Sequence, residues 1–341
     1  MFFPDTKKRQ IHYFFETIIA VYSVLTNRGG RKINTPLSYW QRYTKIAFKY
    51  GSAKKYVNLA RAYYNYRKGT AHIPTKPAFL KVEISRKCTV NCKYCYEKKD
   101  DVFFPLVSYK QLIDKLKDYI FLVSLYDIGE PLQNDQFSEY VEYANKRKIG
   151  TIISTSLSLE RSDDFWKELV TSGLDRMIVA IDGVTPEVYN QYRTNGDLEL
   201  VMKNLKKILA YRTKYKSDLV VEWQIIDLPW NKSEQSAAKE MAKKLGCDEF
   251  RIIKEAVLDR KNYKCDNIIR CSNCLLPYII LIITAYGQVR PCYKVYTNDD
   301  AMILGDLSRD TYEHIWNNGE ISKIRDKDEI RSRPCCMTCQ E

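Results

Sequence analysis

The feature that most constrains this chain is a set of three closely spaced cysteines, Cys88, Cys92 and Cys95. They follow a hydrophobic, strand-like run at 79–85, so their thiols lie in a short loop directly after a strand. A 4Fe–4S cluster has four iron corners, and three thiolates leave one iron open to a small chelating molecule. The alternatives are three unrelated buried cysteines or a zinc site. Zinc sites usually pair two C-x-x-C knuckles, and no second knuckle lies nearby in the sequence, so the spacing favours a cluster.

The motif C-x-x-x-C-x-aromatic-C, with Tyr94 as the aromatic residue, resembles the signature of the radical S-adenosylmethionine (SAM) enzymes. A second stretch, 126–131, reads Tyr-Asp-Ile-Gly-Glu-Pro and is similar to that family's Gly-Gly-Glu-Pro motif, with Ile128 in place of the first glycine. The resemblance covers roughly residues 78–341. It implies that SAM chelates the open iron and that one electron from the cluster releases a 5′-deoxyadenosyl radical, which abstracts hydrogen from carbon.

Length and composition favour one main domain with appendages. The chain of 341 residues contains no apolar run of about 18 residues, so we expect no membrane-spanning helix. Phe2 and Phe3 precede a basic run and no small-residue cleavage site follows, which is not the pattern of a signal peptide. These features predict a cytoplasmic location, where clustered cysteines are typical of metal or cluster ligands.

Residues 1–75 form a basic, aromatic-rich segment that we expect to be a helical extension. This segment contains 14 of the 55 Lys and Arg residues but only two Asp or Glu residues, so it carries nearly all of the net charge of +13. Apolar residues recur at helical spacing near its start, and further helices are predicted at 37–50 and 54–68. Pro74 and Pro77 mark the linker to the main domain.

The excess charge of residues 1–75 allows several interpretations. The simplest is a helical cap on the main domain, with its lysines facing solvent. The functional interpretations are an acidic electron donor such as a flavodoxin or ferredoxin, an anionic membrane surface, or a phosphorylated substrate. A membrane surface would make the protein peripheral at the membrane. Nucleic acid is less favoured, because no recognition module is visible.

From residue 78 to 255 the pattern alternates between strands and helices. Strand-like runs are found at 79–85, 120–126, 149–154, 176–181, 219–226 and 249–254. Helical stretches lie near 108–118, 134–147, 163–172, 198–213 and 232–245. This order predicts an α/β fold with a parallel sheet, and it matches the partial (β/α)6 barrel of the radical SAM family. In parallel α/β folds the chemistry occurs at the carboxyl ends of the strands, where both family motifs fall.

The resemblance also implies a set of SAM contacts. Glu130 would accept a hydrogen bond from the SAM ammonium, and Gly129 would let the backbone approach the ligand. The stretch 182–193 resembles the family's Asp-Gly…Tyr…Arg segment, whose arginine could clamp the SAM carboxylate. The predicted SAM-binding residues are Tyr94, Gly129, Glu130, Ser154, Ser156, Asp182, Arg193 and Gln224. The residues alone also allow a strand-ending turn at Glu130, a solvated helix arginine at Arg193 and ordinary strand packing at Gln224.

Residues 256–341 break the repeat and are rich in cysteine. Cys274 and Cys292 flank a hairpin-like segment with Pro277 and Gly287, and Cys336 and Cys339 form a C-x-x-C knuckle. This arrangement resembles the SPASM and twitch domains, and it implies a second, auxiliary 4Fe–4S cluster with four thiolate ligands. Cys271 and Cys335 are alternates for neighbouring ligands, and a structural zinc would satisfy the same donors. Because the sequence ends two residues after Cys339, we expect the shorter twitch form with one auxiliary cluster.

Together these features predict a radical SAM oxidoreductase with two 4Fe–4S clusters. The favoured substrate is a small polar molecule such as a sugar, cyclitol or nucleoside, which is oxidised with the help of the auxiliary cluster. One alternative is a peptide-modifying maturase of the same family. Another is a non-catalytic iron–sulfur or electron-transfer protein, which Ile128 and the altered Thr-Asn-Gly motif at 154–156 favour. No catalytic acid or base is assigned, because His12, His72 and His314 all lie outside the barrel motifs.

Overall fold

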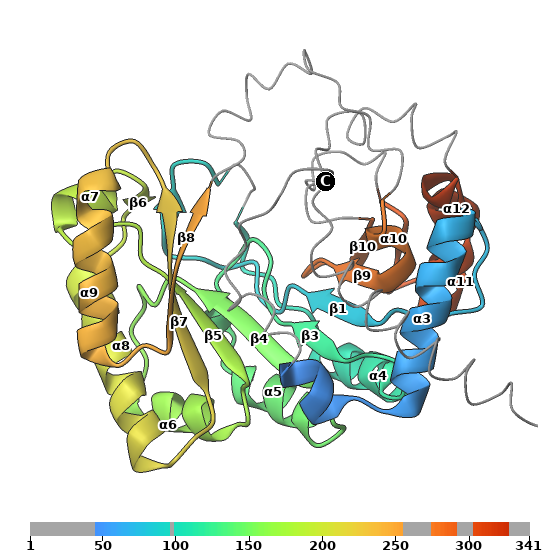
Figure 1. Cartoon of the computed structure of the whole chain (residues 1–341), viewed down its shortest axis with the longest axis horizontal. Helices are drawn as coiled ribbons and strands as arrows, with labels where there is room; N and C mark the ends of the chain where they lie inside the picture. Colours follow the sequence, from blue (N-terminus) through green and yellow to red (C-terminus); the bar gives the residue numbers. More distant parts are fainter. Residues whose placement is uncertain (1–44, 96–98, 255–273, 292–302, 327–341) are drawn as a thin grey trace, which may run out of the picture.

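The computed structural model describes residues 45–95, 99–254, 274–291 and 303–326. This part of the chain forms a curved sheet whose main helices pack on its outer side (Figure 1). The sheet has the strand order β11-β10-β9-β1-β3-β4-β5-β7-β8. Its strands are β1 (Phe79–Val82), β3 (Leu122–Ser124), β4 (Gly150–Thr155), β5 (Arg176–Ala180), β7 (Val220–Asp227), β8 (Glu249–Lys254), β9 (Ile280–Ile283), β10 (Gln288–Arg290) and β11 (Gly305–Asp306).

The six strands from β1 to β8 are parallel, and helices connect them in the predicted order. These helices are α4 (Leu106–Leu116), α5 (Phe137–Asn145), α6 (Asp163–Thr171), α8 (Leu198–Lys214) and α9 (Gln235–Leu245). Shorter elements are η1 (Pro131–Gln133), α7 (Pro186–Asn190), η2 (Lys232–Glu234) and a small ladder of β2 (Asn91–Cys92) with β6 (Arg193–Thr194). The predicted α/β fold with a partial barrel is therefore confirmed.

The two faces of the sheet differ in polarity, and β7 shows the difference most clearly. Val221, Trp223 and Ile225 alternate along this strand and are fully buried in the core beneath the helices. Glu222 and Gln224 lie between them and therefore point to the concave side of the sheet. This alternation places apolar side chains outside, against the helices, and polar side chains inside the partial barrel.

The C-terminal hairpin extends the barrel sheet. Strand β9 pairs in parallel with β1, and β10 returns antiparallel to β9 through a turn at Gly287, whose φ is 86°. The predicted hairpin is confirmed, and its first strand occupies Ile280–Ile283. Residues 276–279 form α10 (Leu276–Ile279), because Pro277 suits the first turn of a helix and the buried Tyr278 donates to a backbone carbonyl of a neighbouring helix.

The described part of the N-terminal extension is helical, as predicted. Residues 45–50 are helical, and α3 (Ala53–Lys68) begins at the N-cap Ser52 and ends at Gly69 in a left-handed conformation. Helix α3 lies beside α10 (Figure 1), and the rings of Tyr66 and Tyr278 are 5.7 Å apart. Beyond the end of α3, the Ala71 carbonyl accepts from Arg325 of α12 (Gly319–Arg325) at 3.2 Å, and the Thr75 carbonyl accepts from Trp316 of α11 (Tyr312–Asn317) at 2.8 Å. The helices predicted before residue 45 lie outside the described residues. Within the described ranges, no helix has the length and apolar character needed to cross a bilayer.

Asp175 fixes this extension to the base of the barrel. Its carboxylate is 2.8 Å from the Lys49 ammonium, and it also accepts from the Tyr50 hydroxyl at 2.9 Å and the Thr151 amide at 2.9 Å. Burial and the charge of Asp175 raise the pKa of Tyr50 to about 12. A buried carboxylate with three donors is therefore expected to stabilise the fold more than a surface ion pair does.

We expect the Asp175→Ala variant to lower the free energy of unfolding by about 2–4 kcal/mol, because it leaves buried donors without an acceptor. The matched control is Asp118→Ala, which removes an ion pair of the same 2.8 Å length between Lys54 and Asp118. Both side chains of that pair are more than half exposed, at 54% and 55%, so we expect little or no change in the free energy of unfolding for Asp118→Ala. Urea unfolding monitored by circular dichroism measures both, and equal midpoints for the two variants would contradict the assignment.

Candidate active site

The three cysteines of the first motif lie in the loop that leaves β1. All three are partly exposed, and the loop turns where the Cys95 amide donates to the Cys92 carbonyl at 2.9 Å. The Thr89 hydroxyl donates to the Ser158 carbonyl at 2.9 Å, beyond the end of β4. In the ladder of β2 with β6, Cys92 lies opposite Arg193. The cysteine loop is thus held across the carboxyl ends of the strands, as the sequence predicted.

The thiols suit a cluster of several irons better than a single ion. Within the part of the chain that the structure describes, no three His, Cys, Asp or Glu side chains converge closely enough to hold one metal ion. In a cubane each thiolate binds a different iron, so the sulfurs need not converge on one point. Burial, with a contribution from the Glu130 carboxylate, raises the pKa of the Cys88 thiol to about 11. Iron binding would have to displace that proton, since the thiolate is the ligand.

Gly129 and Glu130 follow β3 and pack directly against the start of the cysteine loop. A Cβ atom at Gly129 would lie 2.1 Å from the Ser85 carbonyl oxygen, so only glycine fits this position. The Glu130 amide donates to the Lys87 carbonyl at 2.8 Å. The close approach that the sequence indicated at Gly129 is therefore made to the backbone next to Cys88.

The Glu130 carboxylate is buried and is oriented by the turn after β4. One oxygen accepts from both the amide and the hydroxyl of Ser156 at 2.8 Å, and the other accepts from the Leu132 amide at 3.2 Å. Burial raises the pKa of Glu130, while these hydrogen bonds and one from the Thr155 side chain oppose the shift. The structure thus brings Glu130 and Ser156 together, whereas Ser154 lies within β4 and is partly buried.

Asp182 and Arg193 form a second polar pair on the far side of the cysteine loop. The fully buried Asp182 carboxylate is 2.7 Å from Arg193 Nε and accepts the Ile226 amide at 2.7 Å with its other oxygen. Arg193 Nη1 lies 3.4 Å from the Cys92 sulfur. The guanidinium is therefore placed beside the cluster loop, rather than on the solvated helix that the sequence also allowed.

The structure also describes Tyr94 and Gln224, two further predicted SAM-binding residues. The Tyr94 ring is 5.9 Å from the Tyr192 ring. Gln224 lies on the concave face and accepts a hydrogen bond from the Arg251 guanidinium. Of the predicted auxiliary ligands, Cys274 is described and packs partly buried against the core. Cys271, Cys292, Cys335, Cys336 and Cys339 lie outside the described residues.

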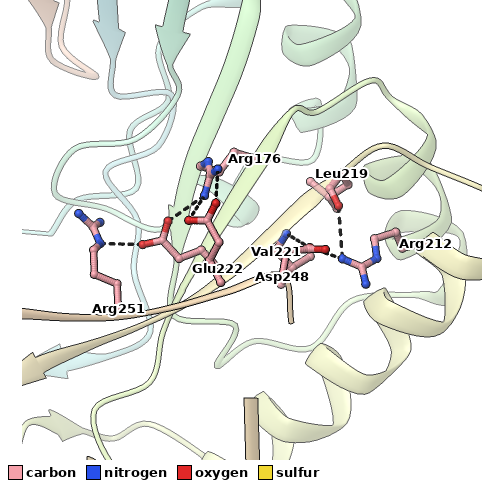
Figure 2. Close-up of polar contacts among 8 residues, drawn as sticks. Arg176, Arg212, Leu219, Val221, Glu222, Asp248 and Arg251 are labelled. Atoms are coloured by element: carbon pink, nitrogen blue, oxygen red, sulfur yellow. Dashed lines mark hydrogen bonds and ion pairs between the residues drawn. The ribbon is translucent and has the colours of Figure 1, made fainter. Parts of the chain in front are cut away.

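Sequence reasoning missed a set of charged residues on the concave face of the sheet. Arg176, Glu222 and Arg251 form ion pairs of 2.9 and 2.7 Å (Figure 2), and Lys81 pairs with Asp127 at 2.6 Å. The Lys81 ammonium is 5.1 Å from the ring centre of the partly buried Tyr126; burial raises the pKa of this tyrosine, and Lys81, Arg251, Asp127 and Glu222 all act on it electrostatically. For Lys81, Glu222 and Arg251 the available signal was period two, since each of them lies between apolar residues of its strand.

A three-cysteine loop at the carboxyl ends of parallel strands is typical of α/β proteins that hold a 4Fe–4S cluster with one iron open to a ligand. The sequence pattern of the radical SAM superfamily matches residues 82–221, and that of SPASM, an iron–sulfur cluster-binding domain, matches residues 271–340. The chain belongs to the radical SAM superfamily and carries a C-terminal domain of the SPASM type.

Curated relatives match parts of the chain. The antilisterial bacteriocin subtilosin biosynthesis protein AlbA of Bacillus subtilis is 23% identical over 293 residues, which cover 76% of this chain and 64% of AlbA. A probable GTP 3′,8-cyclase of Methanococcus maripaludis is 30% identical over 136 residues, covering 38% of this chain and 45% of the cyclase. The chain thus spans less than two thirds of the length of these relatives.

Solved structures share the fold. Streptococcus suis SuiB bound to its precursor peptide SuiA has a TM-score of 0.61 at 11% identity, covering 91% of this chain and 78% of SuiB. The protein anSMEcpe with bound AdoMet has a TM-score of 0.51 at 13% identity, covering 77% of this chain and 85% of that protein. These similarities concern the architecture, and they agree with the partial barrel described above.

Proposed function

We propose that this chain is a radical SAM enzyme that oxidises a small polar substrate with the help of a C-terminal auxiliary cluster. The observation that carries the proposal is the convergence of three features at the carboxyl ends of the strands: the cysteine loop, the Glu130–Ser156 pair and the Asp182–Arg193 pair. When bound, the first cluster and SAM supply an electron and a 5′-deoxyadenosyl radical for hydrogen abstraction. Cys88, Cys92 and Cys95 would hold that cluster.

The chain's own residues would bind and orient SAM. Ser156 fixes the Glu130 carboxylate through two hydrogen bonds, so its negative charge is available for the SAM ammonium. Asp182 orients Arg193 next to the Cys92 sulfur. A guanidinium carries five N–H donors, and these two contacts use only some of them. We assign the SAM carboxylate as the anion that binds the other donors of Arg193.

The polar concave face supports a small polar substrate. Glu222 and Gln224 lie on β7, and Arg251 is the residue of β8 in register with Gln224. Lys81 pairs with Asp127 and lies 5.1 Å from the centre of the Tyr126 ring. A substrate rich in hydroxyl groups could exchange its water contacts for hydrogen bonds with such side chains. An apolar substrate would displace water from these polar side chains without offering hydrogen bonds in return, which costs free energy.

Peptide modification is the second candidate. It is favoured by the similarity to AlbA, which covers 76% of this chain and whose role is in bacteriocin biosynthesis. The SuiB structure with its precursor peptide shares the fold. The same chemistry would then act on a side chain or backbone carbon of a peptide, with the concave face binding the polar backbone.

Deuterium transfer distinguishes the two substrate classes. The anaerobically reconstituted, reduced chain is mixed with SAM and with carbon-deuterated sugars, cyclitols and nucleosides, or with deuterated peptides. Deuterium in 5′-deoxyadenosine from a small polar compound supports the proposal, and transfer from peptides alone supports the second candidate. If no 5′-deoxyadenosine forms under any condition, the protein is better described as a non-catalytic iron–sulfur protein.

The Glu130→Gln variant tests the SAM site itself. The amide keeps the shape of the side chain but removes the charge, so we expect SAM affinity to fall at least about tenfold. Glu139→Gln is the matched control, because Glu139 is exposed on α5. Equilibrium dialysis with labelled SAM measures both variants. Unchanged affinity in Glu130→Gln would remove Glu130 from the site.

A further inference from the structure

The fully buried Glu83 carboxylate joins three separate segments of the chain. Glu83 lies directly after β1, and its two oxygens accept from Arg86 Nη1 at 3.0 and 3.2 Å. One oxygen also accepts from the Gly129 amide at 3.3 Å, and the other from the Ala285 amide at 3.0 Å. Gly129 belongs to the loop that carries Glu130, and Ala285 belongs to the turn of the β9–β10 hairpin. One carboxylate therefore ties the proposed SAM loop to the hairpin of the C-terminal domain.

The same hairpin contacts the loop after β3 at a second position. Arg290 on β10 is almost fully buried, and its Nη2 is 3.7 Å from the carboxylate of Asp127. Asp127 also pairs with Lys81 of β1 at 2.6 Å. The loop that carries Gly129 and Glu130 is thus connected to β10 through Asp127 and to the hairpin turn through Glu83.

The hairpin also reaches both ends of the cysteine loop. The Tyr286 hydroxyl donates to the carboxylate of Asp100, five residues after Cys95. Before the loop, the Arg86 guanidinium lies 5.8 Å from the centre of the Tyr286 ring, and the Arg86 amide donates to the Val102 carbonyl at 2.8 Å. The hairpin turn therefore supports the segments on both sides of the three cysteines.

Because of these contacts, the cysteine loop, the loop after β3 and the β9–β10 hairpin have little freedom to move independently of one another. Gly129 has no room for a Cβ atom against Ser85, and the Glu130 amide is bonded to the Lys87 carbonyl. A displacement of Glu83 or Arg86 would therefore shift Gly129 and Glu130 as well. The Ala285 amide donates to the same carboxylate, so a displacement of the hairpin turn would also shift Glu83 and, through it, Gly129.

We infer that Glu83 is a positioning residue for SAM and that the β9–β10 hairpin is a structural part of the SAM site. The inference rests on the proposed binding of SAM near Glu130. It adds that the C-terminal domain acts on the first site through direct contacts, in addition to any electron transfer between clusters. Glu83 acts through Gly129 and Arg86 and does not itself need to contact SAM.

The Glu83→Gln variant tests this inference. Its amide group cannot accept from all the donors that face the carboxylate, so amide hydrogen exchange should accelerate at both Gly129 and Ala285. We expect the dissociation constant of SAM to rise at least about tenfold while the iron bound through the cysteine loop is retained. The change that SAM causes in the electron paramagnetic resonance spectrum of the reduced cluster should also be reduced. A purely structural role would lower the melting temperature but leave SAM affinity and this spectral change as in the wild type.

A second variant keeps the inference testable if Glu83→Gln does not fold. Tyr286→Phe removes only the hydroxyl contact with Asp100 on a side chain that is 39% exposed, and it should weaken SAM binding about threefold. Tyr64→Phe, on the exposed surface of α3, is the matched control and should bind SAM as the wild type does. The inference is overturned if Glu83→Gln holds iron and binds SAM with wild-type affinity. If Glu83→Gln does not fold, the inference is overturned when Tyr286→Phe holds iron and binds SAM with wild-type affinity. A wild-type chain that fails to bind SAM would instead overturn the proposed function.

Discussion

Replacing Cys88, Cys92 and Cys95 together by alanine is expected to abolish 5′-deoxyadenosine formation and to lower the iron content of the reconstituted chain from about eight atoms to about four. The loop would supply the three thiolates of the first cluster. Among the described residues, no group of three His, Cys, Asp or Glu side chains is placed to hold a metal ion in their absence. The variant should keep its fold, because all three cysteines are partly exposed.

The control for this triple variant is Cys247→Ala. Cys247 packs against the core away from the cysteine loop, and burial raises the pKa of its thiol to about 11, which suits a structural thiol rather than a ligand. Iron and SAM cleavage should stay at wild-type levels in this variant. Iron analysis and chromatography of 5′-deoxyadenosine measure both outcomes. Cleavage that survives loss of the three cysteines would contradict the site, and iron that falls to near zero would mean that the C-terminal domain holds zinc or no metal.

Local patterns predicted the barrel strands and helices because each element carries its own signal. Strand β7 was expected at 219–226 and occurs at Val220–Asp227, since its apolar residues alternate with polar ones. Helix α8 was expected at 198–213 and occurs at Leu198–Lys214, with Asp197 as its N-cap. The three-cysteine loop was found from spacing alone, because cluster ligation imposes a fixed order of residue types on a short segment.

Contacts between distant segments could not be predicted in this way. The parallel pairing of β9 with β1 joins residues about 200 positions apart, and nothing in either strand specifies the other. Arg193 comes to the Cys92 sulfur only because β2 and β6 pair across the site. Glu83 and Arg86 form a visible i,i+3 charge pair, but their link to Gly129 and Ala285 needs the folded sheet. The sequence therefore identified the chemistry of the site better than the framework that holds it.

The buried ion pairs on the concave face make Glu222→Ala the variant with the largest expected effect on stability. Glu222 is fully buried and bridges Arg176 on β5, at 2.9 Å, and Arg251 on β8, at 2.7 Å (Figure 2). Arg176 is itself 6% exposed, so removing Glu222 leaves a buried guanidinium that only Glu249 partly compensates, with contacts of 3.0 and 3.1 Å. Removing one partner of a buried ion pair typically costs about 3–5 kcal/mol.

The neighbouring Arg212–Asp248 pair provides the matched control for Glu222→Ala. Figure 2 shows both pairs in one view; the Asp248 carboxylate also accepts the Val221 amide at 2.8 Å, but it is 41% exposed. Because water can take over much of the interaction of Asp248 with Arg212 and Val221, Asp248→Ala should lower the free energy of unfolding by only about 1 kcal/mol. Neither variant touches the cysteine loop, so iron content should stay the same while the urea midpoint falls far more for Glu222→Ala. Equal midpoints would mean that water reaches Arg176 and screens its charge, and would contradict the assignment of Glu222 as its buried partner.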